Sequence, residues 1–258
     1  MPKIRVEIRD SGIIFRGWSE ETKGVDEIVE RLDFSVERAC EIGFKNIVVL
    51  IPKDKDCGVT YPKILKKILN RKSSSKMFVR SPIGNESSDV INEGLALLRA
   101  EKSKIAFIVS NKAVGYLNKP NVEKMLTTFD DGAFVSGLAL RNTSIHELED
   151  HTYRGILVGR ISNIFAAWHL DSLDKRCNFD SKIGVEEIAP IVRLIKENSV
   201  CIAPVIPTEG VGLNISPLRS EHFAELSRSK IERQLSEAKR AGGTFQLIEA
   251  GIIIGYPQ

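Results

Sequence analysis

The sequence predicts an α/β protein with a mostly parallel sheet flanked by helices, and three observations carry this prediction. Ile47 to Ile51 form a continuous apolar run, which is typical of a strand buried on both faces of a parallel sheet. Val25 to Ile42 carries apolar residues at helical spacing instead, and Gly43 is placed to end that helix. Helix and strand signals then alternate along most of the chain, as they do in α/β folds.

The predicted elements follow one another at short intervals. Lys3 to Ile8 alternate charged and apolar side chains, and Gly12 marks a turn before Ile13 to Phe15, so a β-hairpin extension is expected within residues 1–24. Pro52 ends the strand at Ile47 to Ile51. The next expected elements are helix Tyr61 to Leu69, strand Met77 to Val79, helix Ser88 to Ala100, strand Ile105 to Val109, helix Val122 to Phe129 and strand Ala133 to Leu140.

The last part of the chain continues this alternation. Its expected elements are strand Ile156 to Val158, a helix that begins near Glu186, strand Val200 to Val205, helix Leu218 to Ala241 and strand Gly251 to Tyr256. No internal repeat and no low-complexity linker divides the sequence. A single domain over residues 1–258 is therefore expected, with a C-terminal helix and strand over residues 217–258.

The composition excludes several function classes. With 258 residues, 42% hydrophobic and 28% charged, the chain has the composition of a soluble globular protein. It has neither an apolar run long enough to span a membrane nor an apolar signal core, so a cytoplasmic protein without a membrane span is expected. The net charge of +3 is small, and basic residues are not interleaved with aromatic ones, so nucleic acid is not an expected partner.

Two familiar kinds of site are not favoured by the motifs. Neither GxxxxGK[ST] nor GxGxxG occurs in the sequence, which argues against a P-loop or a dinucleotide site. The run His146 to His151 contains histidines and carboxylates, but histidines five residues apart point to different faces of a helix. A solvated acidic loop is therefore favoured over a metal centre there.

An adjacent acidic pair, Glu186 and Glu187, lies where a helix is expected to begin. One apolar face of that helix follows from Ile188, Ile191, Val192 and Ile195. A carboxylate pair of this kind is a candidate general base. Acidic residues are also common in the first turn of any helix, because the helix dipole favours negative charge there. Both interpretations stay open on the residues alone.

Taken in order, several segments resemble the family 2 glycosyltransferases of the GT-A fold over roughly residues 46–207. Asn46 to Pro52 is similar to the family's opening strand, and Asn92 to Ala96 to its NxG helix start. Ser162 to His169, with Leu173 and Phe179-Asp180, is similar to the acceptor-side segment that ends in a GGFD-like turn. Gly184 to Glu187, with Arg193-Leu194, resembles the ED-x-x-L-x-x-R-L pattern.

The resemblance implies a GT-A-like single domain that transfers a sugar from a nucleotide-sugar donor to a hydroxyl acceptor. It makes Glu187 the expected general base, with Glu186 supporting it. The residues expected on the donor and diphosphate side are Asn111, Lys112, Asn92, Pro52 and Asp54. Those expected on the acceptor side are Trp168 and His169.

The chain departs from the family where a DxD motif should hold a metal. After the expected strand Ile105 to Val109 it has Ser110-Asn111-Lys112, and a divalent cation needs anionic oxygens. No metal cofactor is therefore expected, and Mg²⁺ or Mn²⁺ finds no support in the sequence. Two interpretations of Lys112 stay open: it supplies positive charge to the diphosphate in place of a metal, or it is a solvated lysine in a loop.

Two alternatives accompany the enzyme hypothesis. The first is a catalytically inactive GT-A-like domain that binds a nucleotide, a sugar or a protein partner. The second, a nucleotidyltransferase, would need a glycine-rich basic loop after its first strand, and Lys53 to Gly58 offers one glycine. The enzyme is preferred because the acidic pair is present; the donor and the oligomeric state are left open.

Overall fold

The structure is a computed structural model. It describes residues 6–17, 24–53, 57–82, 87–138, 163–173, 200–203, 205–206, 244–248 and 251–255, together with Phe179 and Pro190. The helices in these ranges are α1 (Val25–Ile42), α2 (Cys57–Leu69), α3 (Ser87–Ala100) and α4 (Lys119–Asp130), with short 3-10 helices η1 (Ile8–Asp10) and η2 (Asn111–Tyr116). The strands are β1 (Ser11–Arg16), β2 (Asn46–Leu50), β3 (Lys76–Arg80), β4 (Ile105–Ser110), β5 (Val135–Leu138), β6 (Phe165–His169), β7 (Val200–Ala203), β8 (Val205–Ile206), β9 (Thr244–Ile248) and β10 (Gly251–Gly255).

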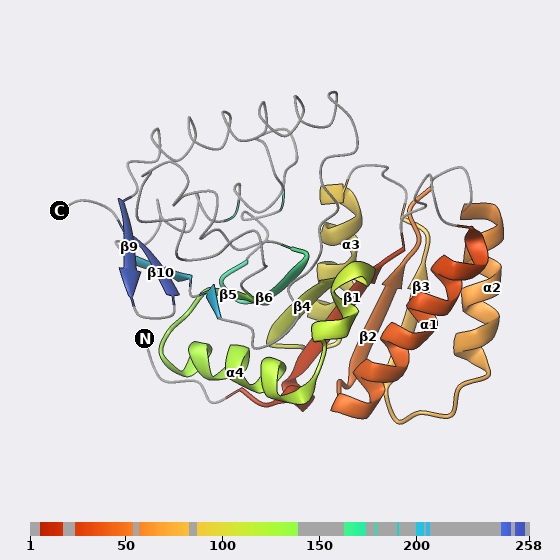
Figure 1. Ribbon diagram of the computed structural model, residues 1–258, viewed down its shortest axis with the longest axis horizontal. Coiled ribbons are helices and arrows are strands. Elements are labelled where there is room, and N and C mark those ends of the chain that lie inside the picture. Colours follow the sequence, from red (N-terminus) through yellow and green to blue (C-terminus); the bar gives the residue numbers. More distant parts are fainter. Residues whose placement is uncertain are drawn as a thin grey trace.

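Seven of the described strands form one mixed, mostly parallel sheet in the order β3-β2-β1-β4-β6-β5-β8 (Figure 1). Strands β3, β2, β1 and β4 are parallel neighbours, and β5 pairs parallel with β8. Strand β6 runs antiparallel between β4 and β5. A second sheet pairs β10 with β7 and β9, antiparallel on both sides. The predicted α/β class with a mostly parallel sheet is confirmed.

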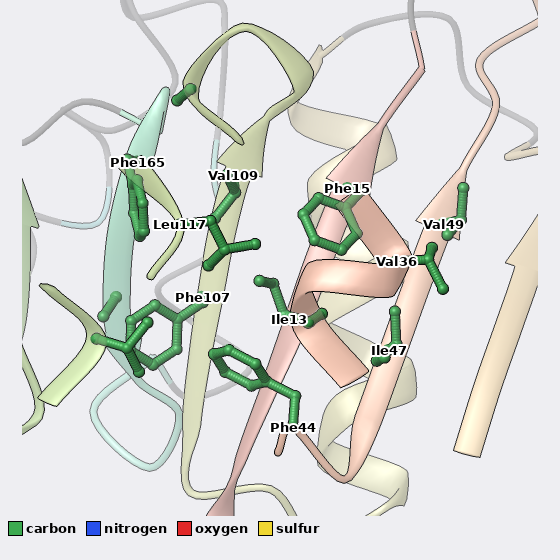
Figure 2. Close-up of a cluster of buried hydrophobic side chains, with 14 of the residues drawn as sticks. Ile13, Phe15, Val36, Phe44, Ile47, Val49, Phe107, Val109, Leu117 and Phe165 are labelled. Atoms are coloured by element: carbon green, nitrogen blue, oxygen red, sulfur yellow. The ribbon is translucent and has the colours of Figure 1, made fainter. Parts of the chain in front are cut away.

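Helices cover both faces of the main sheet, as the continuous apolar strands require. Ile13 and Phe15 point to the face covered by α1, α2, η2 and α4. Figure 2 shows part of this core, with Ile13 and Phe15 of β1, Val36 of α1, and Leu117, which follows η2. Ile14, between Ile13 and Phe15 in β1, belongs to the core on the opposite face, under α3. We call these the α1 face and the α3 face. Side chains alternate along a strand, so each face receives every second residue.

The close packing of α3 on its face depends on a glycine. A Cβ atom on Gly94 would lie 2.8 Å from Cδ1 of Ile14 and 3.0 Å from Cδ1 of Leu50. The first separation is shorter than real Cβ atoms show and the second is tight, so a larger residue would require the Ile14 and Leu50 side chains to shift. Gly94 thus lets the helix backbone approach the centre of the sheet.

The end of α1 follows the predicted local chemistry, and α4 begins with a side-chain cap that was not predicted. Gly43 ends α1 in the left-handed conformation, with φ of 102°, and its N–H donates to the carbonyls of Ala39 and Cys40. Asn118 caps α4 by accepting a hydrogen bond from the Asn121 N–H.

The predicted N-terminal hairpin is wrong. The strand expected at Ile13 to Phe15 exists, but it is β1, a central strand with parallel partners on both sides. Ile8 lies in η1, not in a strand. Both edges of β1 are already paired with β2 and β4, so β1 has no free edge for a hairpin partner. Gly12, predicted to form a turn, lies inside β1, where a Cβ atom would clash with Leu98.

This correction shifts the predicted order of elements. The segment Asn46 to Pro52, expected as the opening strand, supplies the second strand of the sheet. Asn92 to Ala96, expected at a helix start, lies in the middle of α3. Helix α2 begins at Cys57 instead of Tyr61.

The C-terminal part is described only in pieces. The predicted strand at Gly251 to Tyr256 is present as β10, whereas its partner β9 was not expected. The predicted strand Ile156 to Val158 and the predicted helix Leu218 to Ala241 lie outside the described residues. Among the helices that the structure describes, each is too short or too polar to cross a lipid bilayer.

Candidate functional site

The order of the strands reverses at one place in the sheet. From β1 the chain passes to β2 and then outward to β3, and α3 then brings it back to β4 on the other side of β1. In open α/β sheets, ligands bind outside the carboxyl ends of the strands at such a switch point. Here the switch point lies between β1 and β4, where Arg16 and Ser110 are in register as the last residues of the two strands.

Arg16 is the charged residue at this switch point. Its side chain is buried, with a residue exposure of 8%, and Nη2 donates a hydrogen bond of 3.1 Å to the main-chain oxygen of Asn163. Arg16 is absent from the predicted site residues because its segment is predicted to belong to an N-terminal hairpin. If the apolar run Ile13 to Phe15 is assigned to a central strand, the basic residue directly after it indicates a site residue at the carboxyl end of that strand.

Asn163 joins the switch point to β6. It lies two residues before that strand, and the next residue, Ile164, accepts a hydrogen bond of 2.8 Å from the Ser110 N–H. The Asn163 side chain is buried, and its Oδ1 accepts a hydrogen bond of 2.8 Å from Nε1 of Trp168. The antiparallel strand therefore starts beside the carboxyl ends of β1 and β4.

Trp168 links Asn163 to Phe179 through the core of the α3 face. The two aromatic rings pack edge to face, with centroids 4.9 Å apart and an interplanar angle of 85°. Trp168 has no exposed surface, so it cannot touch an acceptor directly. It supports Phe179, a residue of the predicted acceptor-side segment, by packing against the Phe179 ring.

Asn92 of α3 holds the main chain of Phe179 on both sides. Its Nδ2 donates to the Phe179 carbonyl oxygen and its Oδ1 accepts from the Phe179 N–H, each at 3.0 Å. An amide is the side chain that offers one donor and one acceptor in this arrangement. Arg16, Asn163, Trp168, Phe179 and Asn92 thus form one continuous set of contacts, which we call the α3-face polar chain.

Several predicted donor-side residues lie at the carboxyl edge. Asn111 and Lys112 begin η2 directly after β4, and Pro52 is buried two residues beyond the end of β2. Asn92 lies further along α3 with both amide atoms engaged by Phe179. A contact of Asn92 or Pro52 with a donor stays a prediction.

His169 lies at the opposite end of the sheet from these residues. It pairs with Ile105, at the start of β4, five residues from Ser110, which corresponds to about 16 Å of strand. Nδ1 of His169 shares a hydrogen bond of 2.9 Å with Oγ of Ser172, and its ring stacks on Phe129. The structure therefore does not bring His169 together with Asn111 and Lys112.

The local environment perturbs the His169 imidazole. Burial lowers its pKa below the ordinary value, and the charge of Asp171 opposes this shift. The neutral ring is favoured because its charged form would lose solvation. This pKa direction accords with a packing role for His169 at the amino edge of β4.

Asp54, Glu186 and Glu187 lie outside the described residues. Their predicted roles in donor binding and proton removal stay predictions. Phe179, held by Asn92, is the described residue closest in sequence before the acidic pair.

The residues after β4 do not fit a divalent metal. Ser110, Asn111 and Lys112 include no carboxylate, and Mn²⁺ and Mg²⁺ prefer anionic oxygen ligands. Across the described ranges, no group of three or more His, Cys, Asp and Glu side chains is arranged to hold a metal ion. A metal-free site stays the prediction here.

Comparison with known proteins finds similarity among solved structures. No family model and no curated protein sequence matches the chain. Among solved structures, the mannosyltransferase PcManGT from Pyrobaculum calidifontis, in complex with GDP-Man and Mn²⁺, is similar with a TM-score of 0.65. The fold is glycosyltransferase-like. At 11% identity the likeness covers 90% of this chain and 64% of that chain, so it concerns the fold, and the chain spans less than two thirds of the mannosyltransferase's length.

The glycosyltransferase-like fold agrees with the predicted fold class. The predicted membership of family 2 goes further than the similarity reaches. The donor, the acceptor and the reaction therefore belong to the proposal below.

Proposed function

We propose that this chain binds a nucleotide sugar at the carboxyl ends of β1 and β4 and transfers the sugar to a hydroxyl acceptor. The observation that carries the proposal is the switch point of a glycosyltransferase-like sheet, where Arg16 and the Ser110 to Lys112 segment meet. Ligands of open α/β sheets bind at this place. The solved neighbour was in complex with GDP-Man, which supports a nucleotide sugar as the class of donor.

The proposed reaction exchanges one bond for another at the anomeric carbon. The acceptor oxygen bonds to that carbon, its proton passes to the carboxylate of Glu187, and the bond from the carbon to the donor's phosphate oxygen breaks. The electron pair of the broken bond stays on the leaving nucleoside diphosphate. Glu187 is required because a hydroxyl is a poor nucleophile until its proton is removed, and Glu186 supports it.

We propose further that positive protein groups stabilise the leaving diphosphate without a metal bound after β4. Lys112 follows β4 at the switch point, and fixed cations placed where negative charge develops stabilise the transition state. The residue types from Ser110 to Lys112 support this version of the reaction.

A second candidate is a domain that binds a nucleotide sugar without transferring it. The observation that favours it is the same segment, Ser110 to Lys112, which has no carboxylates. The two candidates predict the same ligand class and differ in turnover.

Nucleotide sugars, starting with GDP-Man, should be titrated with and without Mn²⁺ while thermal unfolding is measured. A ligand at 100 times its Kd stabilises the folded state by about 2.7 kcal/mol, which corresponds to about 5–10 °C in Tm for a chain of this size. We expect that shift without Mn²⁺. No shift with any nucleotide sugar would reject the proposal, and a shift that requires Mn²⁺ would reject its metal-free form.

Turnover then separates the two candidates. Glu187→Gln should keep the ligand-induced Tm shift but lower the rate of sugar transfer by about 10²- to 10⁴-fold, the usual contribution of a general base. Glu30→Gln, at an exposed position on α1, is the matched control and should transfer at the wild-type rate. Binding without transfer by the wild type would favour the second candidate.

A further inference from the structure

Helices α1 and α2 lie side by side at the β3 end of the main sheet (Figure 1), and they carry exposed apolar side chains. Among the described residues, the large hydrophobic side chains that remain exposed are Phe34 at 47%, Val59 at 51% and Leu69 at 75%. All three belong to this helix pair. Single exposed apolar residues are ordinary on a protein surface, but their gathering on two adjacent helices indicates a contact surface.

The two helices carry opposite charge. Helix α1 contains six acidic and two basic residues, whereas α2 contains three lysines and no acidic residue. Ion pairs between the helices, such as Lys63 with Asp26, use part of this charge. Glu37 on α1 and Lys66 on α2 are exposed, and neither forms an ion pair within the part of the chain that the structure describes. Their charges are therefore available to a partner.

The exposed apolar and charged residues share one face of each helix. Phe34 and Glu37 are three residues apart on α1, and Lys66 and Leu69 are three residues apart on α2. Residues at this spacing are neighbours on a helix surface. Each helix therefore presents an apolar side chain next to a charged one, negative on α1 and positive on α2.

A second copy of the chain, related by a two-fold axis, brings α2 of one copy antiparallel onto α1 of the other. In an antiparallel helix pair, a step forward along one helix meets a step backward along the other. If Phe34 contacts Leu69 of the second copy, Glu37 consequently lies opposite Lys66 of that copy. The same two contacts occur again on the other side of the axis, because a two-fold interface is isologous.

We propose that α1 and α2 form a homodimer surface, on which α1 of each copy packs antiparallel on α2 of the other. We call it the α1–α2 surface, with Phe34 and Leu69 as its apolar contact and Glu37 and Lys66 as its ion pair. The dimer is independent of the proposed sugar transfer. Opposite charges on the two helices both select this partner and fix its orientation.

A lipid surface is the other occupant that apolar and basic residues on α2 would fit, because interfacial helices combine these residue types. The acidic residues of α1 lie directly beside α2. They would face the same anionic lipid and be repelled by it, whereas in the dimer they face the lysines of the second copy. The charge of the helix pair therefore favours a second copy over a membrane.

The size of the surface sets the expected affinity. Helices of 18 and 13 residues are about 27 and 20 Å long, and at a helix spacing of about 10 Å they present about 500 Å² per copy. A dimer would then bury about 1,000 Å² in total, at the low end of specific interfaces. We expect a reversible dimer with a Kd no tighter than about 1 μM.

Sedimentation equilibrium of the full chain, from well below to well above that concentration, tests the dimer. The variants are Glu37→Lys, Lys66→Glu, both changes in one chain, and Leu69→Ser. Each single charge reversal places like charges opposite one another twice in the dimer, whereas the double variant restores opposite charges with their positions exchanged. Glu123→Lys is the matched control, since it reverses an exposed charge on α4. Circular dichroism establishes that each variant is folded.

The wild type should change from monomer to dimer as its concentration rises. Glu37→Lys and Lys66→Glu should each weaken dimerisation about 10-fold or more, because like charges placed opposite one another at an interface are unfavourable. The double variant should return to within about 3-fold of the wild-type Kd. Leu69→Ser should weaken the dimer about 5- to 10-fold through the lost apolar contact. Glu123→Lys should dimerise like the wild type.

Three results would overturn the proposal. The first is a wild type that stays monomeric at the highest concentration. The second is a dimer that the α1 and α2 variants leave unchanged, because its interface would then lie elsewhere. The third is a loss in both single variants without recovery in the double variant, which would contradict the antiparallel pairing of Glu37 with Lys66.

A vesicle assay addresses the lipid alternative. The wild type should not cosediment with vesicles of phosphatidylcholine and phosphatidylserine. Cosedimentation that Lys66→Glu abolishes and Glu37→Lys strengthens would assign the surface to anionic lipid and overturn the homodimer. None of these results bears on nucleotide-sugar binding, so the proposed function and the dimer stand or fall separately.

Discussion

The two faces of the main sheet differ in where their long-range polar contacts lie. On the α1 face the core is apolar, and the long-range polar contacts lie at exposed or half-buried positions. Examples are the ion pairs of Lys63 with Asp26 and of Lys67 with Asp33, and the hydrogen bond from the Tyr61 hydroxyl to the Val79 carbonyl. On the α3 face, hydrogen bonds between residues far apart in sequence are buried or half-buried. They join Arg16 to Asn163, Asn92 to Phe179 and Asn46 to Ser103.

This difference indicates a division of roles between the faces. Surface ion pairs contribute little to stability and tolerate change. Buried polar groups are costly unless their geometry is maintained, so a fold that keeps them is specified tightly at those points. A polar substitution is therefore expected to cost more on the α3 face, where Asn92 holds Phe179 and Arg16 binds Asn163, than at the ion pairs of the α1 face.

The largest effect is expected from the apolar core of the α1 face. Phe107→Ala removes a fully buried ring that packs edge to face on Phe44, with centroids 5.2 Å apart. The free energy of unfolding should fall by about 3–5 kcal/mol, measured by urea denaturation. The control Phe34→Ala, on an exposed part of α1, should cost less than about 1 kcal/mol. Similar losses in both variants would contradict the assigned core.

The next effect tests the α3-face polar chain. Asn92→Asp has nearly the same shape but replaces the Nδ2 donor with an oxygen that faces the Phe179 carbonyl. The free energy of unfolding should fall by about 1–3 kcal/mol, the usual cost of a lost buried hydrogen bond. Asn70→Asp, at an exposed position after α2, is the matched control. If both variants have the wild-type stability, Asn92 does not hold Phe179 in solution.

A smaller effect is expected for the ion pairs between α1 and α2. Asp33→Asn removes the carboxylate that contacts both Lys67 and Arg71. The loss of unfolding free energy should be less than about 1 kcal/mol and should shrink at 1 M salt. A loss as large as that of Asn92→Asp, unaffected by salt, would show that the two faces do not differ as described.

The smallest effect concerns the pH dependence of stability. Burial lowers the pKa of His169, with the charge of Asp171 opposing it, so the unfolded chain takes up the proton first. Neutral His169 therefore makes its full contribution to the free energy of unfolding above about pH 6.5, the ordinary histidine pKa. This contribution is lost as the pH falls through the lower pKa of the folded state. Urea unfolding at pH 7.5 and 5.5 should therefore show a smaller stability difference for His169→Gln than for the wild type. An equal difference in both proteins would remove His169 as a source of pH sensitivity.

Features that depend on local sequence patterns are predicted correctly, whereas features that depend on contacts between distant segments are not. The apolar run at Ile47 to Ile51 and the helical stripe before Gly43 are local patterns, and both elements are present as predicted. Gly12 also looks like a local signal, yet in β1 its role is close packing against Leu98. A turn glycine and a packing glycine cannot be told apart by sequence position, so the hairpin prediction failed and Arg16 was overlooked.

The fold brings some of the predicted site residues to the carboxyl edge of the sheet and leaves others elsewhere, again because strand pairing is not a local pattern. Asn111 and Lys112 follow a parallel strand, and residues in that position come to the carboxyl edge whatever the order of the strands. His169 is predicted on the acceptor side because it belongs to a segment that resembles that side of a glycosyltransferase. The antiparallel direction of β6, which sends His169 to the other end of β4, is a matter of pairing and not of local pattern.

The amino-acid sequence by itself determined the α/β class, the alternation of helices and strands, and the absence of acidic residues after β4. These follow from side-chain periodicity and residue chemistry, which are local properties. Only the tertiary structure decided that β1 is the central strand, that β6 is antiparallel, and that Arg16, Asn163 and Asn92 lie on the same face of the sheet. Those facts depend on which strands pair, and pairing joins residues as far apart in sequence as Arg16 and Asn163, so no local pattern encodes it.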